Sequence, residues 1–254
     1  MPRRLVFACL LAVSPALAQE AAPIIAYAPR ALPVQARHAM VVAQEGQAAR
    51  IGLDVLKRGG NAVDAAVATA FALAVTLPRA GNLGGGGFML IHDAASRKTV
   101  ALDFRETAPA ATTRDVFLNA DGRADPGKSR SSGLGVGTPG TVAGLLHALE
   151  RYGSGRFDRA ALVAPSVAMA RDGLVVGDDL ADSLPLAASR LGRFPSSAKI
   201  FLPQGAPLRE GERLVQADLA ATLETIAREG ARGFYEGAVA EKLVAAVNAA
   251  GGRM

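Results

Sequence analysis

One arginine in the sequence has a setting in which it could bind a substrate. Arg105 follows an apolar run at 98–104, precedes Pro109, and lies between the carboxylates of Asp103 and Glu106. A guanidinium at the end of a strand can bind a carboxylate through two parallel hydrogen bonds. The alternative is a surface or interdomain ion pair, which spacing alone favours. The residues therefore make Arg105 a candidate carboxylate-binding side chain without an assigned reaction.

Residues for nucleophilic or metal chemistry are sparse. Thr112 and Thr113 form a pair, and a threonine is a nucleophile when its own α-amine is freed. Their neighbours offer no catalytic partner, and a cut there would divide a compact region. The sequence has no G-x-S-x-G elbow, no H-E-x-x-H pair and a single cysteine, Cys9. The histidines lie far apart, at His38, His92 and His147. We expect no metal site and no cofactor.

Four consecutive glycines at 84–87 suggest a phosphate-binding loop, but the order of elements excludes one. A P-loop runs from strand through glycines to helix and ends in Gly-Lys-Ser/Thr. Here an apolar helical segment precedes the glycines, and Phe88 stands where the lysine is required. The glycines are expected to serve the fold, by close backbone approach or by turns with positive φ.

The apolar periodicity predicts a layered α/β arrangement, with strands early and helices late. A short buried strand is expected at 40–43, and a β-hairpin from the runs at 88–92 and 98–104. The helix at 62–76 is apolar nearly all round, with Asn61 as N-cap and Asp64 in its first turn, so it belongs in the core. Residues 129–137 are expected to form a mobile loop. Further helices are expected at 44–58, from Thr138 to about 152, at 159–172, at 216–229 and at 237–250.

The first 18 residues have the features of a signal peptide. Arg3 and Arg4 precede an apolar run at 5–13, and Ala16-Leu17-Ala18 fits a cleavage site. A buried N-terminal helix and lipidation at Cys9 are the weaker alternatives. Nine apolar residues are too few to span a bilayer, which takes roughly 20, so no stable membrane insertion is expected. We expect an exported, periplasmic protein, with an extended, proline-containing lead-in at 19–39.

Charge does not indicate a nucleic-acid partner. The 254 residues carry 28 Lys and Arg against 23 Asp and Glu, a formal net charge of +5. The arginines are scattered, and aromatic residues are not interleaved with them. Half of the residues are apolar, enough for a sizeable core.

Five motifs together resemble the γ-glutamyltransferase family, also called glutathione hydrolases. They are G-G-N-A-V-D-A-A-V-A at 59–68, A-G-N-L-G-G-G-G-F-M-L at 80–90, D-F-R-E-T-A-P at 103–109, G-T-P-G-T-V-A-G at 137–144 and A-R-D-G at 170–173. The resemblance runs from about residue 40 to the end. It implies an N-terminal-nucleophile hydrolase fold, an αββα sandwich of which only the N-terminal part is present. Residues 40–254 are then the N-terminal part of the large subunit.

The resemblance also implies a reaction. Family precursors cleave themselves into two subunits, and the new N-terminal threonine of the small subunit attacks γ-glutamyl amides, including glutathione. The acyl group passes to water or to acceptor amino acids and peptides. Arg105 matches the arginine that binds the α-carboxylate of the γ-glutamyl group. Family precursors are more than twice this long, so no catalytic residue is expected in this chain, and a C-terminal half is expected as its partner. The alternatives are an acylase or a poly-γ-glutamate-processing relative, or an inactive truncated remnant.

Overall fold

The computed structural model describes residues 33–254; the predicted signal peptide and most of the lead-in lie outside the described residues. Contacts divide the chain into residues 1–38 and a compact unit from Ala39 to Met254, which contains all the helices and strands of the described residues. Its helices and strands are α1 Gly46–Lys57, α2 Ala62–Thr76, β1 Phe88–Asp93, β2 Lys98–Asp103, α3 Pro126–Ser131, η1 Gly133–Gly135, α4 Thr141–Tyr152, α5 Arg159–Asp172, β3 Leu174–Val175, α6 Asp178–Leu191, α7 Pro195–Phe201, η2 Pro203–Gly205, β4 Arg213–Leu214, α8 Ala217–Glu229, α9 Arg232–Tyr235 and α10 Gly237–Ala249.

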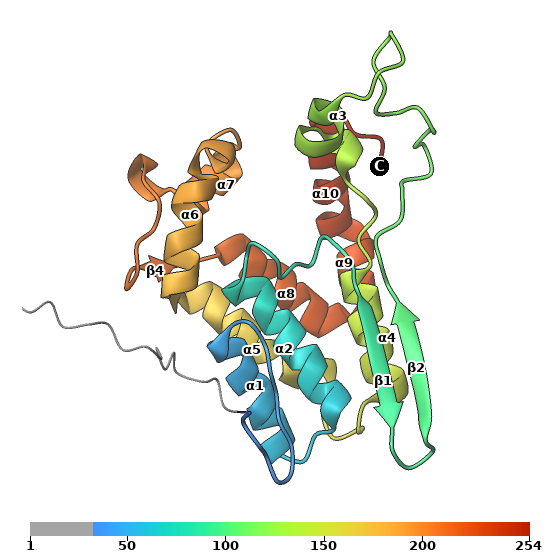
Figure 1. The fold of residues 1–254 in the computed structure, drawn as a ribbon, viewed down its shortest axis with the longest axis vertical. Helices are drawn as coiled ribbons and strands as arrows, with labels where there is room; N and C mark the ends of the chain where they lie inside the picture. The colour runs from blue at the N-terminus through green and yellow to red at the C-terminus, as the bar shows by residue number, and fades with distance from the viewer. Residues whose placement is uncertain (1–32) are drawn as a thin grey trace, which may run out of the picture. The chain divides into compact units, whose positions relative to one another are not determined.

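Helix α2 is the centre of the core. It packs against α1, α4 and α5, and α5 packs in turn against α8 (Figure 1). Val67, Phe71 and Val75 are fully buried, as expected for a helix without a polar face. Asn61 caps it through the amides of Val63 and Asp64, so the predicted start and end of this helix are confirmed.

The predicted hairpin is confirmed. Strands β1 and β2 pair antiparallel, with Phe88 opposite Asp103 and Asp93 opposite Lys98, and they lie alongside α4 (Figure 1). Exposure alternates along both strands: Met89 and Ile91 pack against the core, whereas Phe88 and Leu90 are 66% and 76% exposed. One face of the hairpin is therefore covered, and the other is open, with Phe88 and Leu90 among polar neighbours such as Asp103.

The sequence expectations for two segments, 40–43 and 129–137, are wrong. Residues 40–43 form no strand, because no other strand of the described chain lies beside them; Val41 packs against the core, but Val42 is 83% exposed. The expected loop at 129–137 is largely helical, in α3 and η1. Its order comes from a distant contact, since the amide of Gly133 donates to the carbonyl of Ala250 at 2.8 Å.

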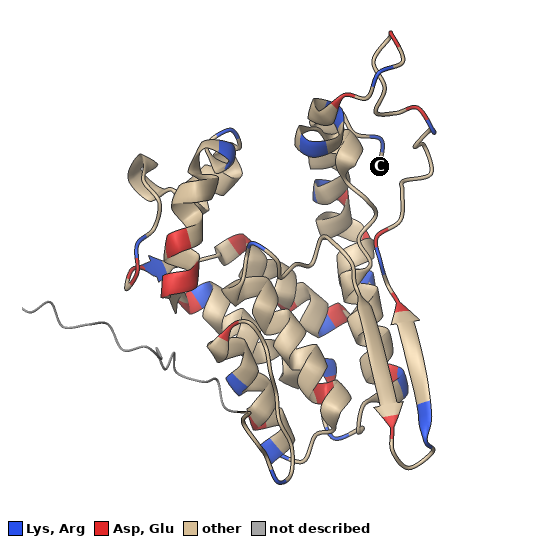
Figure 2. Ribbon diagram, in the orientation of Figure 1, with Lys and Arg blue, Asp and Glu red and all other residues tan. Residues whose placement is uncertain are grey.

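Charged positions of both signs are interspersed along the ribbon, whereas the central helix α2 has only Asp64 (Figure 2). Among residues 33–254, no helix is long and apolar enough to cross a membrane. The same residues contain no group of three or more His, Cys, Asp or Glu side chains placed to hold a metal ion.

Candidate functional site

Arg105 lies just beyond the end of β2. Gly87 and Phe104 exchange two backbone hydrogen bonds, of 3.3 and 3.1 Å, which extend the hairpin by one residue pair. The side chain of Phe104 then packs inward, against Gly87 and Gly144. Burial continues to alternate past the strand, so that Asp103 and Arg105 are both on the exposed side. Arg105 therefore extends from a fixed backbone beside the open face of the hairpin.

The guanidinium of Arg105 keeps most of its donors available. Its side chain is 64% exposed, and its one ion pair within the described chain joins Nε to Oε1 of Glu106 at 3.8 Å. The sequence suggested that both flanking carboxylates hold this side chain, but Asp103 does not. Its Oδ1 accepts the backbone amide of Arg105 at 3.0 Å, because an aspartate readily bonds the amide two residues further on. Such a weakly paired guanidinium can bind a carboxylate of a ligand.

The glycine run lets the loop contact the Arg105 segment directly. A Cβ on Gly86 would overlap the amide nitrogen of Glu106 and lie 2.7 Å from Cα of Arg105. A Cβ on Gly87 would lie 2.9 Å from the ring of Phe104. Gly84, in contrast, has open space around it. The structural interpretation of the glycines is confirmed, with close backbone approach as the reason.

A third segment, the turn at 137–141, completes this arrangement. Thr107 and Thr138 exchange backbone hydrogen bonds of 3.3 and 2.7 Å. The amides of Gly140 and Thr141 donate to the carbonyl of Gly85 at 2.7 and 3.1 Å. The hydroxyl of Thr141 donates to Oδ1 of Asn82 at 2.7 Å. Residues 82–87, 103–107 and 137–141, hereafter the strand-end cluster, thus bring three of the five motifs together.

The strand-end cluster changes where α4 begins. Thr138 was expected to cap this helix with Pro139 in its first turn, but the helix starts at Thr141 with Gly140 as N-cap. The expectation is wrong because Thr138 is bonded to Thr107 instead. A Cβ at Gly140 would overlap the carbonyl oxygen of Phe104, so no capping side chain fits there.

Tyr235 supplies the side-chain hydrogen bond that the N-cap residue of α4 cannot provide. Its hydroxyl accepts the amide of Ala143 at 3.1 Å and donates to the carbonyl of Pro139 at 3.0 Å. Burial raises the pKa of this phenol, and the hydrogen bond from Ala143 opposes that rise only in part. Tyr235 lies at the end of α9, far along the chain, and no local sequence signal marks it.

The remaining candidate residues do not form a second site. Thr112 and Thr113 lie in turns, and neither hydroxyl has a hydrogen-bond partner in the described part of the chain. His92 has Nδ1 3.0 Å from the hydroxyl of Thr99 across the hairpin, an exposed cross-strand pair. Cys9 lies outside the described residues.

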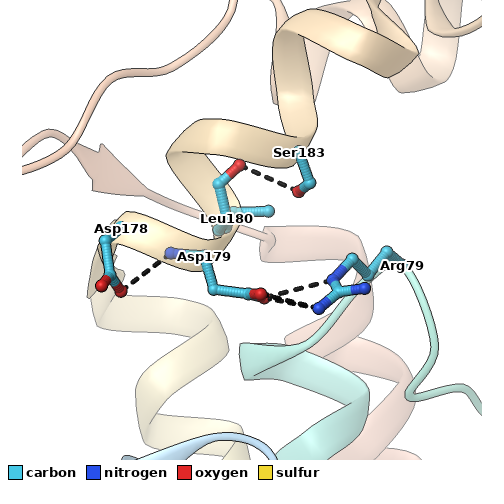
Figure 3. Close-up of polar contacts among 5 residues, drawn as sticks. All are labelled: Arg79, Asp178, Asp179, Leu180 and Ser183. Atoms are coloured by element: carbon cyan, nitrogen blue, oxygen red, sulfur yellow. Dashed lines mark hydrogen bonds and ion pairs between the residues drawn. The ribbon is translucent and has the colours of Figure 1, made fainter. Parts of the chain in front are cut away.

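A separate feature lies where α2 ends. Arg79 binds Asp179, at the start of α6, through three contacts of 2.7 to 3.1 Å (Figure 3). Both side chains are about half exposed, so the pair contributes at most about 1 kcal/mol. Beside it is an apolar cavity of about 470 Å³, lined mainly by α6 residues such as Leu184 and Leu186. None of its lining residues belongs to the strand-end cluster.

Comparison with known proteins places the chain in a family of enzymes. The family model described as gamma-glutamyltranspeptidase matches residues 48–254. A glutathione hydrolase proenzyme of Escherichia coli is 47% identical over 256 residues, covering 98% of this chain. The chain belongs to the gamma-glutamyltranspeptidase family. It spans only 44% of the length of the E. coli relative.

Solved structures agree with this assignment. Helicobacter pylori gamma-glutamyltranspeptidase superposes with a TM-score of 0.84 at 41% identity, covering 87% of this chain and 63% of the other. A cephalosporin acylase from Bacillus halodurans superposes with a TM-score of 0.69 at 27% identity, covering 91% of this chain and 44% of the other. The predicted fold class, the α/β N-terminal-nucleophile hydrolase fold, is confirmed for the part that this chain represents.

Proposed function

We propose that this chain is the N-terminal part of the large subunit of an exported γ-glutamyltransferase, or glutathione hydrolase. The complete protein would cleave γ-glutamyl amides and pass the γ-glutamyl group to water or to an acceptor amino acid or peptide. The observation that carries the proposal is the position of Arg105. A guanidinium with unused donors extends from a backbone fixed by three motifs that resemble the family's.

In this proposal Arg105 holds the α-carboxylate of the γ-glutamyl group by two charge-assisted hydrogen bonds. That contact fixes the far end of the substrate and so places the γ-amide for attack. The attacking threonine would come from the remaining length of the protein. Its hydroxyl oxygen adds to the amide carbonyl, the amine leaves with a proton, and the resulting ester is cleaved by water or by an acceptor amine.

Exposed apolar side chains support the proposal of a missing half. Phe88 and Leu90 on the hairpin, and Met40 and Val42 before α1, are large hydrophobic residues open to solvent. Apolar surface of this kind marks contacts with another polypeptide segment. We propose that the remainder of the protein, formed by cleavage of a common precursor, covers these residues. Export to the periplasm is proposed from the signal-like segment at 1–18.

Substitution of Arg105 tests the function. In the full-length gene product, Arg105→Ala should raise KM for γ-glutamyl donors by about tenfold or more, because two charge-assisted hydrogen bonds are lost. Arg114→Ala is the matched control, since Arg114 is also an exposed arginine next to an acidic residue, with a side chain 96% exposed. An unchanged KM in the Arg105 variant would remove Arg105 from the site.

Related functions have their own tests. The likeness to a cephalosporin acylase favours, as second candidate, an acylase acting on glutaryl amides, which keep the terminal carboxylate but lack the α-amino group. Faster turnover of a glutaryl than of a γ-glutamyl amide would support it. If the chain is instead an inactive remnant, the 254-residue product alone should be monodisperse and melt cooperatively. Aggregation of that product, and a reading frame continuing beyond codon 254, would count against the remnant.

A further inference from the structure

We propose that Tyr235 is a positioning residue for Arg105. Its hydroxyl fixes the turn against which the backbone of Arg105 rests, and it does so from a distant part of the chain. This inference rests on the proposed function, because the role of Arg105 in binding a substrate carboxylate comes from there. Tyr235 itself would not touch the substrate.

The hydroxyl of Tyr235 is held in a defined place. Its ring lies edge-on to Phe234, with ring centroids 5.0 Å apart and planes at 82°. Phe234 is 4% exposed and belongs to the core. From this anchored ring the oxygen reaches both the carbonyl of Pro139 and the amide of Ala143. One hydroxyl therefore bonds both sides of the N-cap residue of α4.

The turn needs this partner because it has no cap of its own. The first amides of a helix lack partners within the helix, and a side chain at the N-cap usually satisfies one of them. Gly140 cannot do so, since any side chain there would overlap the Phe104 carbonyl. The close contact between the backbones of Gly140 and Phe104 thus leaves no room for a capping side chain at the N-cap. The hydroxyl of Tyr235 replaces it.

Displacement of the turn at 137–141 would disturb the backbone on either side of Arg105. On one side, the Gly140 backbone rests against the carbonyls of Phe104 and Arg105. On the other, Thr138 is bonded to Thr107, two residues after Arg105. Without the phenol, Pro139 and Ala143 lose a shared anchor and both contacts loosen. The guanidinium of Arg105 remains present, but the backbone from which its side chain extends is held less firmly.

The test compares Tyr235→Phe with Tyr152→Phe in the full-length gene product. Tyr152, at the end of α4, is half-buried, and its hydroxyl makes no hydrogen bond within residues 33–254, so it is the matched control. Two donors are used: a γ-glutamyl anilide and its α-carboxamide, which lacks the charged carboxylate. We expect Tyr235→Phe to raise KM about three- to tenfold for the first donor only, with kcat nearly unchanged. Tyr152→Phe should change neither.

A double-mutant cycle with Arg105→Ala separates this inference from the proposed function. If Tyr235 acts through Arg105, Tyr235→Phe should have no further effect on KM in the Arg105→Ala background. Multiplying effects, equal effects on the two donors, or no effect of Tyr235→Phe alone would each overturn the positioning role. If Arg105→Ala itself leaves KM unchanged, the proposed function fails first.

Folding is controlled separately. The thermal unfolding midpoint of each variant is measured, and the assays are run at a temperature well below the lowest midpoint. If Tyr235→Phe does not fold, Thr138→Pro tests the same connection with the phenol intact, because it removes the amide that donates to Thr107 at 2.7 Å. The same KM rise, limited to the α-carboxylate donor, is expected. Its absence in a folded Thr138→Pro protein would overturn the inference.

Discussion

Asp64 is a fully buried carboxylate whose partners are backbone amides. Its Oδ2 accepts the amide of Asn61 at 2.8 Å, closing the capping box at the start of α2. Both of its oxygens also accept the amide of Ser154, at 3.2 and 3.3 Å, beyond the end of α4. One side chain thus caps the central helix and holds a turn 90 residues away. Replacing it with asparagine keeps its shape but removes one acceptor and the charge.

The cost of Asp64→Asn can be estimated from these contacts. Asparagine has one carbonyl oxygen, so its amide group must face one of the two backbone donors. The variant loses a charge-assisted hydrogen bond and leaves one part-buried backbone amide without an acceptor, at a cost of about 1.5–3 kcal/mol. The favourable interaction of a carboxylate with the helix N-terminus is lost as well. We expect α2, and with it the core, to lose stability by this amount.

Urea unfolding of the full-length gene product, followed by circular dichroism, measures the effect. The matched control is Asp54→Asn, on the exposed side of α1, where the carboxylate is 68% exposed and lies 3.8 Å from Lys57. The control should change the free energy of unfolding by less than about 0.5 kcal/mol. If Asp64→Asn cost as little as the control, the assigned role of this carboxylate would be refuted.

Two further predictions concern the strand-end cluster. Gly86→Ala should destabilise the protein by about 1–3 kcal/mol, since its Cβ would overlap backbone at Glu106, whereas Gly84→Ala, in open space, should be nearly neutral; equal losses in urea unfolding would contradict this. Because burial raises the pKa of Tyr235 above its ordinary 10.0, the fold favours the neutral phenol. That stability is complete below pH 10 and is lost as the pH rises through the folded-state pKa. The difference between the alkaline absorbance titrations of the wild type and of Tyr235→Phe isolates this phenol. It should ionise above pH 10, and ionisation at or below pH 10 would contradict the prediction.

Local signals were enough to predict the inner helices. The bounds of α2 and α5 match the predicted 62–76 and 159–172, and α8 and α10 differ by one residue at one end. Their apolar residues lie within the helices, and the side-chain caps of α2 and α5, Asn61 and Asp158, lie directly before them. The capping box of Asn61 and Asp64 is the clearest example of a local signal, because its two residues are only three positions apart.

Elements that depend on distant contacts were not predicted. Helix α6 contains Pro185, and its N-cap, Gly177, offers no side-chain cap, so Asp178 and Asp179 in the first turn are the remaining signal of a helix start. Strands β3 and β4 have two residues each and exist only as a pair. At the site, Arg105 was identifiable from its place after a strand. Tyr235 was not, since its partners lie 92 and 96 positions away.

The same separation has a consequence for folding. Until α9 docks, the start of α4 has the Gly85 carbonyl as an acceptor but lacks the hydrogen bonds of the Tyr235 hydroxyl. Contacts between distant segments form late and slowly. If Arg105 and Tyr235 act as proposed, the site would reach its final geometry only when a helix more than a hundred residues further along the chain has docked.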